Sequence, residues 1–184
     1  MKKILLTSAG FETEGLLKAF HGLLTKEPRD VKALFIPTAS NFPDAVLFLP
    51  KCMNDLLKAG ILRENITVFD LHCNIEIDEL KKYDVIYFTG GNGQYLLERI
   101  NNTGFNNSIC EFVNSGGIYV GVSAGTCVAT NDFPDSLKFI NCTVSSHAAV
   151  GVKSGELDTS NNPHIELSDD NAILILGDMI KIIE

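Results

Sequence analysis

The stretch Gly116–Thr126 constrains the fold of this chain more than any other. After two glycines and a short strand-type run it reads Gly121-x-Ser123-x-Gly125. This spacing is typical of a sharp turn between a strand and a helix, with a serine at its tip. Such a turn presses the residues two before and two after the serine together, and glycine at both places relieves the crowding. The pattern makes Ser123 a candidate nucleophile and the N–H of Ala124 a candidate oxyanion donor, although a helix-capping serine fits the same turn.

Strand and helix patterns alternate along the first two thirds of the chain. Short apolar runs typical of buried parallel strands are Lys3–Ala9, Ala33–Thr38, Ile66–Leu71 and Asp84–Thr89. Helical patterns are Thr13–Leu24, Pro43–Ala59, Asp78–Tyr83, Gln94–Ile100 and Phe105–Asn114. The alternation predicts a three-layer α/β domain with a mainly parallel sheet. Ligands of such sheets bind beyond the carboxyl ends of the strands, where Gly90-Gly91 and Ser123 would both lie.

The last third of the chain has a different pattern. Phe139–Ser146 is a predicted strand that ends beside His147, and the polar segment Gly151–Pro163 is a predicted surface loop. Three further short strands are expected to form antiparallel hairpin pieces at one edge of the sheet: His164–Leu167, Ala172–Leu176 and Met179–Ile183. We expect residues 1–184 to form a single domain.

Composition excludes several classes of function. A net charge of −8, from 15 basic and 23 acidic residues, disfavours a nucleic-acid-binding surface. No apolar run approaches the length of a membrane span. Five cysteines without a C-x-x-C pair indicate reduced thiols in a cytoplasm. We expect no metal and no cofactor, because the adjacent His72 and Cys73 would point to opposite faces of a strand.

A serine nucleophile needs a base to take its proton and an acid to orient that base. His147 and His164 follow Ser123 in the chain and are the candidate bases. His21 lies within a predicted helix and fits a solvated position.

Three motifs together resemble the peptidase E family. They are Phe88–Asn92 (Phe-Thr-Gly-Gly-Asn), Tyr95–Leu97 (Tyr-Leu-Leu) and Gly121–Gly125. Members of this family are serine peptidases, including aspartyl dipeptidases and, as relatives, cyanophycinases. The resemblance implies the class I glutamine amidotransferase-like fold, which is flavodoxin-like, with a serine where the amidotransferases carry cysteine.

The resemblance also implies roles for individual residues. Ser123 would be the nucleophile, and Gly91 would join Ala124 as the second oxyanion donor. His147 is preferred over His164 as the base, because the segment before it looks like the family strand that delivers the histidine. The segment Asn131–Pro134 resembles the part of the family that carries the third triad member. Asp132 is therefore the first choice for the acid.

Asp135 is the second choice for the acid.

The chain departs from the family in having a shorter segment between the histidine and the final hairpin. Only Lys138 and Lys153 are basic between the strand-to-helix turn at Ser123 (the elbow) and that hairpin, and no arginine follows Arg99. The shortened segment and the few basic residues imply an altered specificity or a loss of activity.

Three functions remain open at this point. The first is a cytoplasmic serine peptidase that cleaves short peptides, with N-terminal aspartate as the substrate residue that the resemblance implies. The second is another amidase that acts on a small-molecule amide. The third is a catalytically silent amidotransferase-like domain that binds a metabolite or a partner. Homodimerisation is also an open expectation.

Overall fold

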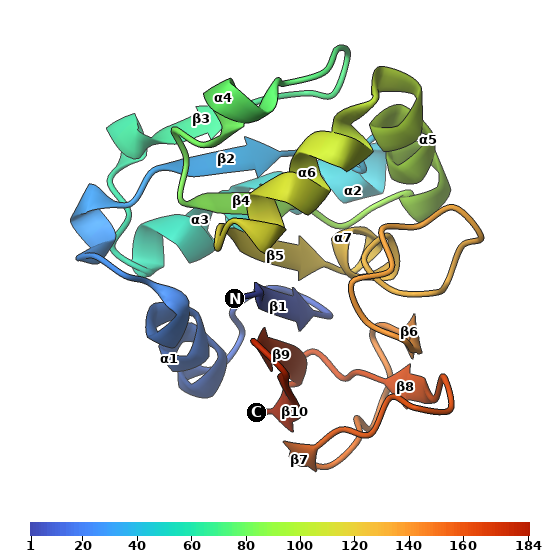
Figure 1. Ribbon diagram of the computed structural model, residues 1–184. Helices are drawn as coiled ribbons and strands as arrows, with labels where there is room; N and C mark the ends of the chain where they lie inside the picture. Colours follow the sequence, from blue (N-terminus) through green and yellow to red (C-terminus); the bar gives the residue numbers. More distant parts are fainter.

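A computed structural model describes all 184 residues and shows a central sheet of eight strands (Figure 1). Its parallel part has the strand order β3-β2-β4-β5-β1. The bounds are β1 Lys3–Thr7, β2 Ala33–Ile36, β3 Ile66–Val68, β4 Val85–Phe88 and β5 Ile118–Val122. The strands β2, β4 and β5 are buried on both faces, as expected for strands covered by helices on each side. The predicted three-layer, mainly parallel α/β fold is confirmed.

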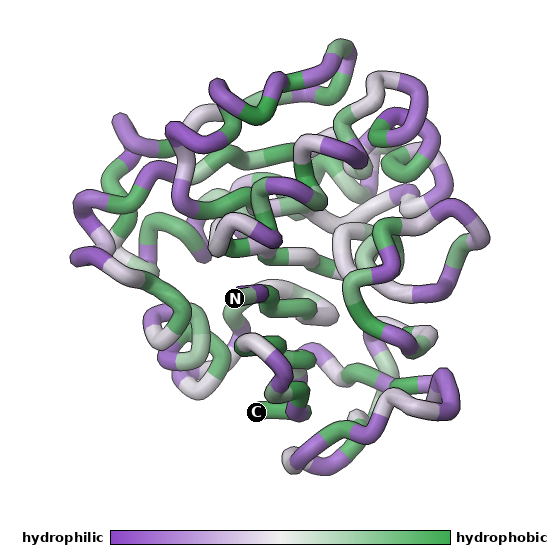
Figure 2. The backbone as a smooth tube through the Cα atoms, viewed as in Figure 1, coloured by the Kyte–Doolittle hydropathy of each residue, from purple (hydrophilic) through white to green (hydrophobic).

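Two helical layers cover the sheet (Figure 1). One layer holds α1 (Glu14–Leu23), α2 (Pro43–Leu47) and α3 (Leu49–Lys58). The other holds α4 (Ile77–Leu80), α5 (Gly93–Thr103), α6 (Phe105–Asn114) and α7 (Ala124–Cys127). Two separate apolar clusters result, one on each face of the sheet, because neighbouring strand residues point to opposite faces. In Figure 2 the strands are accordingly mostly hydrophobic, and the outer loops are mostly hydrophilic.

Three antiparallel strands extend the sheet beyond β1. Strand β9 (Ala172–Leu176) pairs with β1, β10 (Met179–Ile183) pairs with β9, and β7 (Gly155–Glu156) pairs with β10. The predicted hairpin at the sheet edge is therefore present. The segment expected to be a plain surface loop contributes β7, because the edge of β10 has free backbone groups that a short strand can pair with.

Two predicted strands differ from the structure. The strand after the elbow is only β6 (Thr143–Ser145), since the backbone N–H groups of Leu137 and Phe139 donate instead to carbonyls just after α7. Strand β8 (His164–Glu166) does not join the main sheet. It pairs in parallel with β6 as a separate two-stranded sheet.

The predicted helix over Pro43–Ala59 is two helices that meet at Phe48. Pro50 is the reason, since its nitrogen carries no hydrogen to continue the first helix and its ring crowds the preceding turn. None of the helices has the length and apolar character needed to cross a bilayer.

The register of the central strands determines which loops meet. Thr7 at the end of β1 lies beside Val122 at the end of β5 on one side and beside Ala172 at the start of β9 on the other. The residues that follow β1 and β5 and precede β9 therefore converge at one edge of the sheet.

Candidate active site

Ser123 stands at the tip of the turn between β5 and α7. Its backbone has φ 47° and ψ −100°, which is a strained conformation for a residue with a side chain. The Ser123 N–H donates to the carbonyl of Thr7 over 3.0 Å. Thr126 secures the other side of the turn, because its buried hydroxyl is 2.8 Å from the Thr7 carbonyl and 2.9 Å from that of Gly121. The surrounding structure thus holds the strained serine in place.

The glycines around the serine are required by close backbone contacts. A Cβ on Gly121 would lie 2.5 Å from the carbonyl oxygen of Gly125. A Cβ on Gly125 would lie 2.7 Å from Cβ of Phe88 and 2.8 Å from its carbonyl oxygen. These distances show that the residues two before and two after the serine do press on one another, as the sequence pattern predicts.

His147 is the histidine that reaches Ser123. Its Nε2 is 3.3 Å from the Ser123 Oγ, and its backbone also has a positive φ of 61°. The backbone N–H of His147 donates to the hydroxyl oxygen of Ser8, the residue that follows β1, over 2.6 Å. This bond ties the strained histidine to the edge of the central sheet.

Asp169 occupies the other side of the imidazole. Its Oδ1 is 2.7 Å from Nδ1 of His147, a length typical of charge-assisted hydrogen bonds. The Ser8 hydroxyl donates to the same oxygen over 3.0 Å. The carboxylate and the hydroxyl together keep the imidazole oriented so that Nε2 faces the serine.

Asp132, the acid chosen from the sequence, lies elsewhere, and this is a correction. Its carboxylate accepts the N–H of Val144 at 3.1 and 3.2 Å and the hydroxyl of Thr130. It therefore anchors the start of β6, while both ring nitrogens of His147 are occupied by Ser123 and Asp169. Asp135, the second choice for the acid, makes one hydrogen bond in the structure: its backbone carbonyl accepts the side-chain amide of Asn101.

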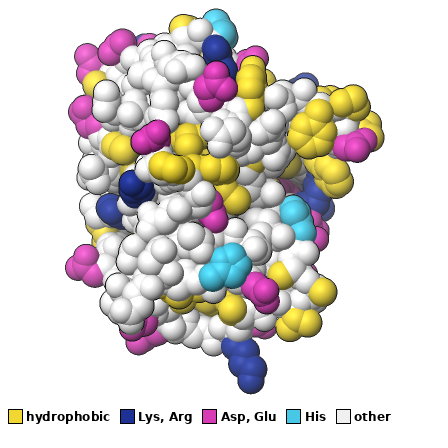
Figure 3. Space-filling model, turned by 90° about the vertical axis from the view of Figure 1, so that its right-hand side faces the viewer, with side chains coloured by type: hydrophobic (Ala, Val, Ile, Leu, Met, Phe, Trp, Pro, Cys, Tyr) yellow, Lys and Arg dark blue, Asp and Glu magenta, His cyan; other side chains and the backbone are white.

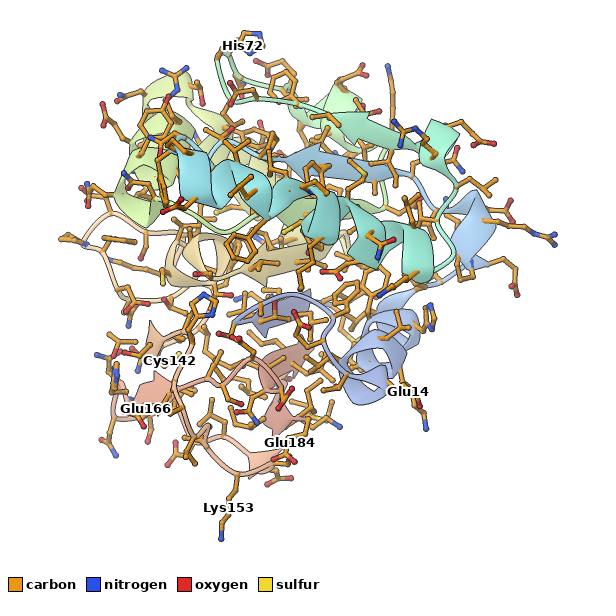
Figure 4. All side chains as sticks on the ribbon, turned by 180° about the vertical axis from the view of Figure 1, so that it is seen from behind. Glu14, His72, Cys142, Lys153, Glu166 and Glu184 are labelled. Atoms are coloured by element: carbon orange, nitrogen blue, oxygen red, sulfur yellow. The ribbon has the colours of Figure 1, made fainter.

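The remaining histidines are also engaged away from the serine. His164 has its Nδ1 2.9 Å from the Thr143 hydroxyl and its Nε2 3.0 Å from the Ser145 hydroxyl. His72 projects from the outer rim of the molecule (Figure 4). The structure has no group of three or more His, Cys, Asp and Glu side chains arranged to hold a metal.

Gly90 and Gly91 form a turn directly against the elbow. A Cβ on Gly90 would lie 3.3 Å from Cβ of Ser123. Gly91 has a φ of 134°, and a Cβ there would lie 2.1 Å from the carbonyl oxygen of Ala39, so only glycine fits. The N–H groups of Gly91 and Ala124 donate to no acceptor within the protein. Both donors are thus free of competing acceptors within the protein.

Comparison with known proteins identifies the family. The profile of Peptidase family S51 matches residues 4–171. The chain belongs to Peptidase family S51. It is accordingly a peptidase of the serine hydrolase type.

Individual relatives agree with this placement. The chain is 28% identical over 168 residues to the uncharacterized peptidase Lmo0363 of Listeria monocytogenes, a match that covers 89% of this chain and 78% of the relative. It is 31% identical over 130 residues to the uncharacterized peptidase Lin0382 of Listeria innocua, covering 71% of this chain and 60% of the relative. The chain thus spans less than two thirds of the length of the second relative.

Solved structures show the same fold. The crystal structure of a candidate peptidase E protein from Listeria monocytogenes superposes with a TM-score of 0.77 at 21% identity, covering 99% of this chain and 98% of that one. A peptidase from an acI-B1 actinobacterium gives a TM-score of 0.64 at 18% identity, covering 95% of this chain and 83% of that one. At these identities the similarity concerns the fold.

A cavity of about 390 Å³ opens beside the serine of this S51 protein. Ser8, Ser123, His147 and Asp169 line it together with the Gly90-Gly91 turn, α2 and the start of α3. Figure 3 shows the face at which the parallel strands end, with exposed histidine, hydrophobic and acidic side chains and only scattered basic ones. The volume lies in the range of small-molecule and peptide sites.

The cysteines near this site are poor nucleophiles. Burial, followed by the charge of Asp55, raises the pKa of the Cys52 thiol in the cavity. Burial, followed by the charge of Asp132, raises the pKa of Cys127 to about 12. Because only the thiolate attacks, a raised pKa makes each thiol a weaker nucleophile.

Two residues of the site were not identified from the sequence, Asp169 and Ser8. Both carry a signal that could have been used, since Ser8 directly follows a predicted central strand and Asp169 lies in the turn just before another. Strand pairing decides which of the many acidic loops reaches the histidine, and no local pattern contains that information.

Proposed function

We propose that this S51 protein hydrolyses short peptides through an acyl-enzyme formed on Ser123. The observation that carries the proposal is the hydrogen-bonded series from Ser123 Oγ to His147 Nε2 at 3.3 Å and from His147 Nδ1 to Asp169 at 2.7 Å. Nucleophile, base and orienting acid in hydrogen-bond reach of one another are the recurring parts of serine hydrolases on unrelated folds.

The reaction would proceed in two halves. As the Ser123 oxygen bonds to the substrate carbonyl carbon, its proton passes to Nε2 of His147, and Asp169 stabilises the resulting imidazolium. The C–N bond then breaks, and the Nε2 proton goes to the leaving amine. In the second half, Nε2 of His147 takes a proton from water as the water oxygen bonds to the acyl carbon; the ester bond to Ser123 then breaks, and the Nε2 proton returns to the Ser123 oxygen. The products are a carboxylic acid, an amine and free serine.

Gly91 and Ala124 would stabilise the oxyanion between these steps. Ala124 directly follows the serine, Gly91 follows Gly90, which packs against the serine, and neither N–H has an acceptor in the protein. The backbone of Gly91 is fixed by its packing on Ala39, so this donor would need no reorganisation during reaction. Removal of one such donor from an active site costs roughly 3 kcal/mol of transition-state stabilisation.

A fluorophosphonate probe tests the proposal, because it forms a stable bond only with an activated serine. We expect labelling of the unaltered protein, no labelling of Ser123→Ala, and a labelling rate reduced at least about 100-fold in His147→Ala, which lacks the general base. His164→Ala is the matched control and should label normally.

Labelling that persists in Ser123→Ala, or no labelling of the folded, unaltered protein, would refute this function. The second result would favour a catalytically silent domain. Equal losses in the two histidine variants would refute the assignment of the base.

A further inference from the structure

We propose that the site prefers peptides with a large apolar residue before the scissile bond and discriminates against aspartate there. This inference rests on the proposed function of Ser123. It differs from the aspartyl specificity that the family resemblance implies, and it follows from the side chains that surround the cavity.

The wall of the cavity next to the serine is apolar. It is formed by Phe42 before α2, Ala45 within it, Phe48 at the break between α2 and α3, Cys52 on α3, and Val122 directly before Ser123. Ala45, Cys52 and Val122 are buried, so they form a dry floor. An apolar side chain of a bound peptide would lie on this floor and lose its contact with water.

The two phenylalanines are exposed at the rim of the cavity. Phe48 retains 62% of its surface and Phe42 retains 43%. Figure 3 shows hydrophobic side chains protruding at the upper right, on the side of α2. Both aromatic rings would gain contacts from an apolar substrate residue.

The cavity offers no free cation for a substrate carboxylate. Its one basic residue, Lys51, bonds to the carboxylate of Glu12 and to the carbonyl of Ala9. Burial alone would lower the pKa of Lys51, but the hydrogen bond to Glu12 and the charges of Asp55 and Glu12 outweigh it and raise that pKa. The lysine charge is therefore already matched by protein carboxylates.

Further acids make the cavity unfavourable for an acidic substrate. Asp44 lines it and has no hydrogen-bond or ion-pair partner in the structure, and Asp169 lies beside the base. An aspartyl side chain would have to lie among like charges, which disfavours its ionised form.

The basic residues of the last third do not compensate. Lys153 extends away from the body of the molecule into solvent (Figure 4). Lys138 lines a different hollow.

Hydrolysis of a matched dipeptide series tests the proposal. The substrates are Phe-Ala, Leu-Ala, Asn-Ala and Asp-Ala, with product release followed by chromatography. We expect kcat/KM for Phe-Ala and Leu-Ala to exceed that for Asp-Ala at least about 10-fold, which corresponds to burial of one large apolar side chain. Asn-Ala, which has the shape of Asp-Ala without its charge, should fall between them. A kcat/KM for Asp-Ala equal to or above that for Phe-Ala would overturn the proposal.

A pair of neighbouring variants locates the effect. Phe48→Ala should lower kcat/KM for Phe-Ala several-fold and lower that for Asn-Ala less. Leu47→Ala is the control, because Leu47 is 77% exposed next to Phe48 but does not line the cavity. Equal behaviour of the two variants towards Phe-Ala would overturn the role of the aromatic rim.

Fluorophosphonate labelling of the same preparation separates the two proposals. Labelling of Ser123 together with an Asp-Ala preference refutes the specificity and leaves the catalytic function standing. Labelling without cleavage of any of these dipeptides likewise refutes the specificity proposed for short peptides. Absence of labelling refutes both.

Discussion

Replacement of Asp169 and of Asp132 by asparagine should separate catalysis from folding. Asp169→Asn keeps the shape of the side chain but removes the charge that faces Nδ1 of His147 at 2.7 Å. A charge-assisted hydrogen bond contributes about 1.5–3 kcal/mol, and loss of the triad acid in serine proteases costs up to about 10⁴-fold in kcat. Because His147 and Asp169 are each more than half exposed, water screens the pair. We therefore expect kcat to fall by about 10²–10³-fold, that is, by roughly 3–4 kcal/mol.

The same substitution at Asp132 should act on stability. The Asp132 carboxylate accepts the N–H of Val144, a buried residue, and the Thr130 hydroxyl, whereas asparagine keeps a single acceptor oxygen, so its amide nitrogen would face one of these two donors and leave it unsatisfied. An unsatisfied buried donor costs about 1–3 kcal/mol. In a chain of this length each kcal/mol lowers Tm by about 2–4 °C, so Asp132→Asn should melt roughly 2–12 °C lower. Asp169→Asn should melt within about 2 °C of the unaltered protein, since exposed pairs contribute little to stability.

The assay is a comparison of kcat, measured with the best dipeptide, and of Tm for the two variants. The expected result is a low kcat with normal Tm for Asp169→Asn and a normal kcat with low Tm for Asp132→Asn. If Asp132→Asn loses as much activity as Asp169→Asn while its Tm is unchanged, the assignment of Asp169 as the orienting acid is refuted.

Three further predictions concern the elbow, the buried carboxylate and the thiols. Gly121→Ala should lower the free energy of unfolding by about 1–3 kcal/mol and reduce activity, because the new methyl group meets the Gly125 carbonyl at 2.5 Å; an unchanged urea midpoint would contradict this. Burial raises the pKa of Asp55, so this group stabilises the fold at low pH, and that stability is lost as the pH rises through the folded-state pKa. The Tyr87 hydroxyl donates a hydrogen bond to the ionised Asp55 carboxylate and so limits the loss. Tyr87→Phe should therefore destabilise more at pH 7 than at pH 4 in urea titrations, and equal effects would refute the coupling. Cys73, the exposed thiol, should be alkylated first in the native protein, as mass spectrometry can show.

Much of the fold was predictable because its central strands carry local signals. Strands buried on both faces are short apolar runs, and the helices between them repeat apolar residues at a spacing that periodicity detects. The break at Phe48 was missed because Pro50 was included in a longer helical pattern. The separate β6–β8 sheet was missed because the pairing of two three-residue strands depends on the fold and not on their composition.

The residues of the candidate site also differ in how far the sequence alone could predict them. Ser123 could be identified because its turn leaves no room for side chains two residues before and two residues after it, so the sequence has Gly121 and Gly125 there. The proximity of His147 was predicted from chain order and resemblance, and the structure places it at hydrogen-bond distance. Asp169 could not be distinguished from Asp132 in this way, since both lie in polar turns near predicted strands. The antiparallel pairing of β9 with β1 decides between them, because it carries the turn before β9 to the end of β1.

The position of β1 between β5 and β9 also determines when the candidate site can first assemble. During synthesis β1 emerges early, yet its two neighbours in the sheet begin at Ile118 and Ala172. Contacts over such long stretches of chain form slowly. A nascent chain that has just added Ser123 still lacks His147 and Asp169. The pairing of β9 with β1, which holds the turn of Asp169 at the end of β1, can therefore form only after the last third of the chain has left the ribosome.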